Sequence, residues 1–345
     1  MQNNKKRIND VKDSKDTGGW TKISADRLDI IRNILLVAAN DIGKLRKEFE
    51  EDIRQKVTPP SSRISKSPSW KDRVIIEYIR AGQVLGLWEF DQSSRLKLEN
   101  RFENQILTII NENNTGEELT SAERHAFASI LLEHTHVSEF LSWFMIDNKH
   151  PVSVKHFLNN STSIALTEIA PKVSRPKGPD TYIKDNVRFS IEKPYIRITW
   201  VNIAWCKAVG LIDEIKVIPK GICREEESHR LYPVKIDGST GKEWTVEELV
   251  NKIIDLYKIN KDEVKRIQIP KLIYDVCTNN FIGVKYFKEL IVRSYKKLRN
   301  DFYLERISSV FVDSKIRRYN LSNNYIRVGG FYRGYLVING AIGGK

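Results

Sequence analysis

Apolar residues recur with helical spacing in several separate segments of the chain. In residues 25–56, one helical face carries Leu28, Ile31, Leu35 and Ala38, and Ser24 precedes them as an N-cap. The same spacing predicts helices within 70–90, 119–145, 151–169, 193–218, 245–259, 269–281 and 284–302. The pair Thr245 and Glu248 forms a capping box at the start of one of them. The pattern therefore favours a chain that is mainly helical.

Shorter apolar stretches predict strands between and after these helices. Residues 70–90 and 193–218 each run from helical spacing into a short strand, and 93–113 begins with another strand. Residues 314–338 are rich in Tyr, Val and Ile and are interrupted by Asn-Asn and Gly-Gly, which predicts β-hairpins. Two basic, proline-containing loops occupy 57–69 and 170–188. The fold class expected is mainly α, of the α+β type.

One junction occurs twice. Residues 82–90 read GQVLGLWEF and residues 205–218 read WCKAVGLIDEIKVI, so that a helix, a Gly-Leu pair and a strand follow one another. Gly86 and Gly210 are placed to adopt the left-handed conformation that ends a helix, with Leu87 and Leu211 packing back on the last turn. A helix that ends in this way and returns as a strand is what a winged helix-turn-helix needs after its recognition helix. Any helix-to-strand connection can use such a pair, so the argument rests on the matched basic loops upstream.

These elements predict two or three winged helix-turn-helix-like modules with short β-wings. Residues 1–22 are a flexible tail, 23–116 the first module and 117–236 the second. Residues 237–345 form a basic C-terminal module with β-hairpins.

The net charge is +13 and the isoelectric point is near 9.4. Residues 260–345 contain 17 Lys and Arg against 7 Asp and Glu, so that ten of the thirteen excess charges lie there. A concentrated positive charge favours polyanionic partners such as nucleic acid, whereas a lysine-rich solvated surface is the alternative.

The three cysteines are widely spaced and odd in number, which indicates a reducing, cytoplasmic setting. The polar N-terminus predicts no signal peptide, and no window is apolar enough for a membrane span. We therefore expect a cytoplasmic protein without a membrane partner.

The junctions at 78–90 and 200–218, with their basic loops, resemble the tandem winged-helix recognition region of FokI-like type IIS restriction endonucleases. The resemblance extends over most of 23–345, but the chain shows no C-terminal nuclease domain. It implies sequence-specific binding of double-stranded DNA, as the target-recognition part of a restriction-modification system, with a separate nuclease subunit as a further partner. Binding itself would need no cofactor.

The resemblance also implies which residues contact DNA. On 71–85, Val74, Tyr78 and Leu85 are predicted to face inward with Ile75 or Ile79. The outward candidates are Lys71, Arg73, Arg80 and Gln83 on 71–85, and Arg197, Asn202 and Lys207 on 194–209. Phosphate or minor-groove candidates in the loops are Arg63, Lys66, Arg175 and Lys177. The C-terminal candidates are Lys296, Arg299, Arg317, Arg318, Arg327 and Arg333, where interleaved aromatic residues such as Tyr325 and Tyr332 predict either a wing or a stacking surface for single strands.

The sequence contains only a partial match to a catalytic motif. Asp180, Glu214 and Lys216 partly match the PD-(D/E)xK pattern of metal-dependent endonucleases, which would use Mg²⁺. No cysteine or histidine spacing predicts a metal site. The alternatives to a recognition protein are such an endonuclease, a non-cutting regulator or replication initiator, and an RNA-binding protein.

Overall fold

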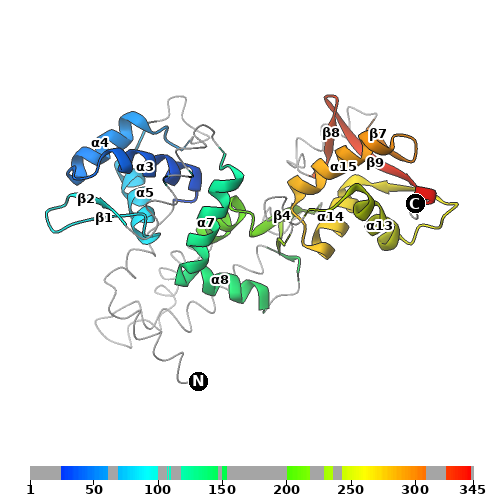
Figure 1. Ribbon diagram of the computed structural model, residues 1–345, viewed down its shortest axis with the longest axis horizontal. Coiled ribbons are helices and arrows are strands. Elements are labelled where there is room, and N and C mark those ends of the chain that lie inside the picture. The colour runs from blue at the N-terminus through cyan, green and yellow to red at the C-terminus, as the bar shows by residue number, and fades with distance from the viewer. Residues whose placement is uncertain are drawn as a thin grey trace, which may run out of the picture. The chain divides into compact units, whose positions relative to one another are not determined.

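The structure is a computed structural model that describes residues 25–60, 69–99, 107, 109, 118–146, 150–153, 200–217, 229–235, 243–307 and 324–342. It combines helices with antiparallel sheets, so the chain is of the α+β class (Figure 1). The chain divides into two compact units. Unit 1 comprises Met1–Ile146 and His156–Val209, and unit 2 comprises Asp147–Lys155 and Gly210–Lys345.

The described part of unit 1 begins with helices α3 (Leu28–Asn40), α4 (Arg46–Lys56) and α5 (Asp72–Val84), followed by strands β1 (Trp88–Phe90) and β2 (Leu96–Leu98). The helical spacing noted over 25–56 is divided between two helices, because the chain turns between α3 and α4. Gly43 lies there at φ +85°, a conformation that a helix does not contain. Residues 43–46 instead pair with the β1–β2 hairpin through the bridge between Leu45 and Arg95.

Aromatic packing holds the β1–β2 hairpin against α4 and α5. Trp88 is fully buried, and its indole N–H donates to the carbonyl oxygen of Ile79 on α5 at 3.2 Å. Its ring meets Phe49 of α4 edge-on, with the ring centroids 6.2 Å apart. The first strand of the hairpin is thus fixed to the helix that precedes it.

The rest of unit 1 contains α7 (Ser121–Glu133), α8 (Thr135–Ile146) and a helix over 200–208. Arg32 on α3 forms a buried ion pair with Glu123 on α7, at 3.0 Å. The buried Trp205 donates its indole N–H to the carbonyl oxygen of Ala25 at 2.9 Å. Segments far apart in the sequence therefore share one core.

Unit 2 contains two sheets. The smaller one has the order β3-β5-β4, from β3 (Val152–Ser153), β4 (Ile212–Lys216) and β5 (His229–Pro233). The larger one has the order β6-β9-β7, from β6 (Val264–Gln268), β7 (Phe302–Arg306) and β9 (Phe331–Asn339), and β8 (Ile326–Val328) also pairs with β9. A short 3₁₀ helix, Gly340–Ile342, follows β9.

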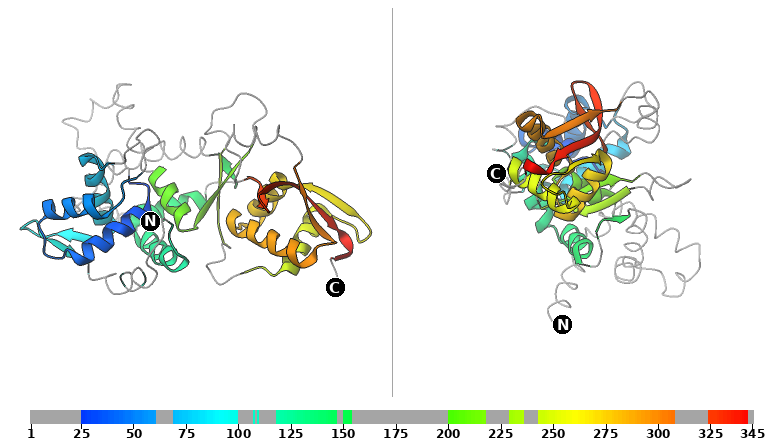
Figure 2. Two further views of the ribbon diagram at one scale, coloured as in Figure 1. Left: turned by 90° about the horizontal axis from the view of Figure 1, so that it is seen from above. Right: turned by 90° about the vertical axis from the view of Figure 1, so that its right-hand side faces the viewer.

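Helices α13 (Val246–Tyr257), α14 (Ile269–Asn280) and α15 (Val284–Leu298) share one apolar core with the larger sheet, as the further views illustrate (Figure 2). The predicted capping box is confirmed, since the Thr245 hydroxyl accepts from Glu248 N–H and the Glu248 carboxylate accepts from Thr245 N–H. The predicted C-terminal hairpin is also confirmed. Gly329 and Gly330, at φ +60° and +81°, form its two-residue turn between β8 and β9.

The smaller sheet is joined to the core of α13–α15. The hydroxyl of Tyr232 on β5 donates to the carbonyl oxygen of Ile282 at 3.0 Å, and Ile215 of β4 belongs to the same apolar cluster. The division between the units consequently falls inside the predicted second module (117–236). Its helices α7 and α8 lie in unit 1, whereas its strands lie in unit 2.

The described elements repeat one order three times along the chain. One or two helices are followed by a strand or bridge and then, after an intervening segment, by a helix and further strands, which number two in the first and second sets and three (β7, β8 and β9) in the third. In each set, the last strand is the central one: β2 between β1 and the Leu45 bridge, β5 between β3 and β4, and β9 between β6 and β7. Among the described helices, none has the length and apolar character needed to cross a membrane.

Candidate nucleic-acid interface

The outward side of α5 is polar and carries the candidates that were predicted on 71–85. Lys71, Arg73 and Gln83 are exposed and Arg80 is half-buried, while Ile75, Tyr78 and Ile79 face the core. The predicted orientation of this helix is therefore confirmed, except that Val74 is only half-buried. Arg73 also forms an ion pair with Glu77 one turn later, at 3.0 Å. The outward face of α5 presents hydrogen-bonding groups of the kind that read base edges.

The end of α5 follows the predicted Schellman arrangement. Gly86 has φ +67°, and its N–H donates to the carbonyl oxygen of Gln83 at 3.1 Å. The N–H of Leu87 donates to the carbonyl oxygen of Gly82 at 2.9 Å, and the Leu87 side chain is buried. Gly210 has φ +80°, so the predicted left-handed conformation is confirmed at both glycines. At the first junction, this geometry sends the chain from the exposed helix directly into the β1–β2 hairpin.

The tip of this hairpin adds two cations that sequence reasoning missed. Arg95 and Lys97 are exposed, and the Arg95 guanidinium donates to the carbonyl oxygen of Gly43 at 2.8 Å. The carboxylate of Asp91 accepts from the backbone N–H groups of Arg95 and Ser93, each at 2.9 Å, and these bonds lower the pKa of Asp91. The signal in the sequence was the polar turn DQSSR between the alternating triplets WEF and LKL.

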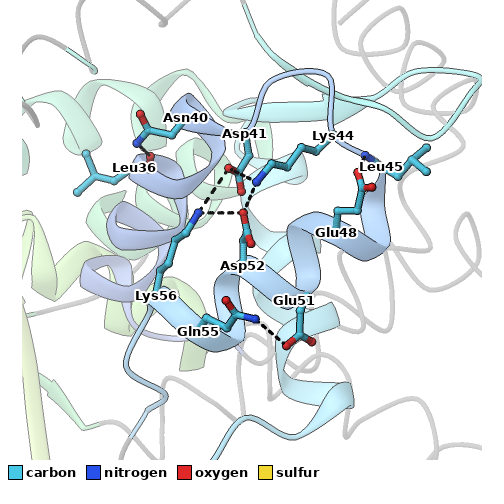
Figure 3. Close-up of polar contacts among 10 residues, drawn as sticks. All are labelled: Leu36, Asn40, Asp41, Lys44, Leu45, Glu48, Glu51, Asp52, Gln55 and Lys56. Carbon is cyan, nitrogen blue, oxygen red and sulfur yellow. Dashed lines mark hydrogen bonds and ion pairs between the residues drawn. The ribbon is translucent and has the colours of Figure 1, made fainter.

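Two other cations of the same region are engaged in an internal network (Figure 3). Asp41 is buried and pairs with Lys44 at 2.8 Å and with Lys56 at 3.6 Å. Asp52 also pairs with both lysines, and its contact with Lys56 measures 2.9 Å. The close-up also shows the Leu45 N–H, which donates to the Glu48 carboxylate at 2.8 Å. The network anchors the turn between α3 and α4, so we do not count its lysines as nucleic-acid contacts.

On the helix over 200–208, only part of the prediction holds. Lys207 is exposed, but Asn202 is 4% exposed, so the prediction that it faces outward is wrong. The reason is that Val201, Ile203 and Trp205 around it are buried as well, so this helix faces protein over more of its circumference than its polar residues indicate. The third candidate of this helix, Arg197, lies outside the described residues.

In unit 2, exposed cations line one side of α15. Lys296 and Arg299 are exposed at its C-terminal end, as predicted. At the other end, the N–H of Val284 donates to a carboxylate oxygen of Asp213 on β4, at 2.7 Å. The N-terminal end of α15 therefore already holds an anion.

The two arginines of the C-terminal hairpin differ. Arg327 is exposed, and its Nε donates to the carbonyl oxygen of Gly330 at 3.1 Å. Arg333 is half-buried and donates to the carbonyl oxygens of Leu304 and Val328, both at 3.2 Å. Two donors of Arg333 are thus engaged with main-chain carbonyls of the sheet, and its contact with DNA stays a prediction.

The catalytic candidates do not assemble into a metal centre in the described part of the chain. Glu214 on β4 pairs with His229 on the neighbouring β5, and Lys216 lies opposite His229 in the strand register. No group of three acidic, histidine or cysteine side chains that could hold a metal ion occurs among the described residues. Outside the described residues lie Asp180, Arg63, Lys66, Arg175, Lys177, Arg317 and Arg318.

Comparisons with known proteins add no relative. A scan against protein-family models, a search of curated proteins and a search of solved structures each found no match.

Proposed function

We propose that the chain is built from three winged-helix modules and binds double-stranded DNA in a sequence-specific manner. The observation that carries this proposal is the order of elements, which occurs three times together with the same strand order in the sheet. In a winged helix, the helix before the two-stranded wing is the one that enters the major groove. Here these helices are α5, the helix over 200–208, and α15.

The first module has side chains suited to base recognition on the outward face of α5. Arg80 and Gln83 lie one turn apart on α5, and guanidinium and carboxamide groups form paired hydrogen bonds with guanine and adenine, respectively. Lys71 and Arg73 at the start of the helix, with Arg95 and Lys97 on the wing, are placed to contact phosphates. We therefore assign base reading to α5.

The third module is assigned a different part. Because Asp213 occupies the N-terminal end of α15, a phosphate would meet a carboxylate there. Lys296 and Arg299 at the opposite end, with Arg327, are exposed and supply non-specific affinity for the backbone. The net positive charge of residues 260–345 supports assigning backbone binding to the third module and base recognition to α5.

We further propose that the chain is the target-recognition part of a restriction-modification system in the cytoplasm, where it acts with a separate nuclease subunit. This rests on the resemblance of the two helix-Gly-Leu-strand junctions. Under this proposal DNA binding requires no cofactor, and Mg²⁺ is needed only for cleavage by the nuclease subunit.

The test is a selection of bound sequences from a random duplex pool at two salt concentrations. Enrichment of one short sequence that persists at the higher salt is the expected result. Binding without any enriched sequence, lost as salt rises, would refute base reading and leave only a basic surface.

Variants separate the two assigned roles. We expect Gln83→Ala to relax selectivity at one position at a cost of about 1–3 kcal/mol. We expect Lys296→Ala to weaken all sequences equally and to reduce the slope of log affinity against log salt by about 1. Lys252→Ala, at an exposed position of α13, is the matched control and should change neither quantity. Equal effects of Lys252→Ala and Lys296→Ala would contradict the assignment.

A further inference from the structure

A groove of about 780 Å³ lies in unit 2 between α15 and the β8–β9 hairpin. Figure 1 shows α15 beside β7 and β8. The wall from α15 is formed by residues 285, 288, 289, 292 and 293, a spacing that places them on one helical face. The opposite wall contains Tyr325, Arg327 and Tyr332. The volume of the groove falls within the range of sites that hold small ligands.

The groove carries cations at three places around its wall. Lys285 and Arg293 are exposed on α15, and Arg327 lies across from them on the hairpin. Lys288 is half-buried between them, and its burial lowers its pKa while the charge of Asp213 opposes that shift. A partly desolvated ammonium group gains more from an anionic ligand than a fully hydrated one.

The acidic residues of the groove are largely committed to other groups. The carboxylate of Asp213 accepts the N–H of Val284 with one oxygen and the N–H of Glu214 with the other, both at 2.7 Å. The carboxylate of Glu214 pairs with His229. Of the acidic residues in the lining, Glu289 remains as an exposed carboxylate. With Glu214 paired to His229, the four basic side chains of the lining outnumber its two other acidic ones, Asp213 and Glu289.

The hairpin wall adds aromatic surface. The rings of Tyr325 and Tyr332 meet edge-on with their centroids 6.2 Å apart, and the Arg327 guanidinium lies 5.8 Å from the centre of the Tyr332 ring. Burial raises the pKa of Tyr325, so its ring stays neutral at physiological pH. Aromatic rings flanked by cations are the combination that holds unpaired nucleotides, because bases stack on the rings while cations contact the phosphates.

We propose that this groove binds an unpaired nucleotide of a single-stranded nucleic-acid segment, with the base against Tyr332 and the phosphate towards Arg327 and the lysines of α15. The proposal goes beyond the proposed duplex binding, because it concerns an unpaired nucleotide at a separate site and does not depend on base reading by α5. Its chemistry is common to DNA and RNA, which the experiment below distinguishes. The helix α15 then serves as one side of a nucleotide site rather than as a second base-reading helix.

The experiment measures fluorescence anisotropy of the full chain with labelled oligothymidylate and oligouridylate of about eight nucleotides, a length within the usual range of such sites. Tyr332→Leu is expected to weaken binding roughly 5- to 150-fold, the loss of one base–aromatic stack. Tyr332→Phe should retain binding. The matched control is Tyr303→Leu, which removes an exposed tyrosine of β7 that does not line the groove.

Three outcomes would overturn the proposal: no single-strand binding, equal binding by Tyr332→Leu and the unchanged chain, or equal loss in Tyr303→Leu. Displacement of the oligonucleotide by polyglutamate at the same charge concentration would also overturn it, because the site would then recognise charge alone. The ratio of the dissociation constants of oligothymidylate and oligouridylate, measured by anisotropy, decides between DNA and RNA. The two proposals can fail separately. If no duplex sequence is enriched but single strands still bind and need Tyr332, the base-reading function is refuted and the assignment of the groove stands.

Discussion

Replacing Gly82 with alanine should destabilise unit 1, although alanine is the better helix former. A Cβ atom at this position would lie 1.9 Å from Cζ2 of Trp88 and 2.1 Å from its Cη2. The first distance is roughly 1.5 Å shorter than an ordinary carbon–carbon contact. Trp88 cannot move away freely, because it is fully buried, bonded to Ile79 and packed on Phe49.

The magnitude follows from two opposing effects. Overpacking a filled core costs about 1–3 kcal/mol, and a contact this short lies at the upper end. Replacing glycine by alanine inside a helix contributes about 1 kcal/mol in the opposite direction. We therefore expect Gly82→Ala to lower the free energy of unfolding by about 2 kcal/mol net. The measurement is urea unfolding followed by circular dichroism.

Two further variants isolate the cause. In a Trp88→Phe background, which lacks the clashing ring atoms, the cost of Gly82→Ala should shrink. Gly86→Ala has open space around the new Cβ but φ +67°, so it should cost about 1–2 kcal/mol through backbone strain alone, and Gly86→Asn should cost less. Unchanged or increased stability of Gly82→Ala, or an equal cost in both backgrounds, would refute this account of the helix–hairpin contact.

Three other predictions concern ion pairs and caps. Arg32→Met should cost about 3–5 kcal/mol because it leaves the buried Glu123 carboxylate without its cation, and a second change, Glu123→Leu, should recover part of that loss in chemical denaturation. Thr245→Ala should cost about 1 kcal/mol and Thr245→Ser almost nothing in the same assay, whereas equal losses would exclude the capping box as the cause. Lys44 and Lys56 hold the pKa of Asp52 well below its ordinary value of 3.8, so the ion pairs stabilise the fold above pH 3.8 and this stabilisation is lost progressively as pH falls from there towards the lowered folded-state pKa. The difference in unfolding free energy between Asp52→Asn and the unchanged chain should therefore be constant near neutral pH and shrink steadily as pH falls below 3.8, and a difference that stays constant there would contradict the assignment.

Much of the candidate interface could be predicted from the sequence because it depends on local properties. The outward face of α5 follows from helical periodicity, and its end follows from Gly86, which tolerates the left-handed conformation that closes a helix. Both strands of the hairpin were predicted, but the exposed cations Arg95 and Lys97 were missed because the pairing of the two strands, which leaves both side chains exposed, cannot be inferred from either strand alone.

The features that the sequence did not reveal share a physical cause. Asn202 is polar and lies where a helical wheel permits exposure, yet neighbours from elsewhere in the chain bury it. Strand β6 has mostly exposed or half-exposed side chains, so its sequence VKRIQ shows no apolar alternation, and pairing with β9 defines it as a strand. Arg333 is indistinguishable from Arg327 in sequence, but only Arg333 lies within reach of two carbonyl oxygens.

The sequence by itself determined where α5, α13, α14 and α15 lie and how α5 and α13 end or begin, since spacing, capping and glycine φ angles are properties of a few adjacent residues. It also determined the strongly basic C-terminal quarter. Tertiary structure alone decided the strand order of each sheet, the buried pair of Arg32 with Glu123, and the placement of Asp213 at the end of α15. The two side-chain contacts join residues 91 and 71 positions apart, and the sheets pair strands from separate stretches of the chain. Such contacts form only where burying apolar surface brings distant segments together.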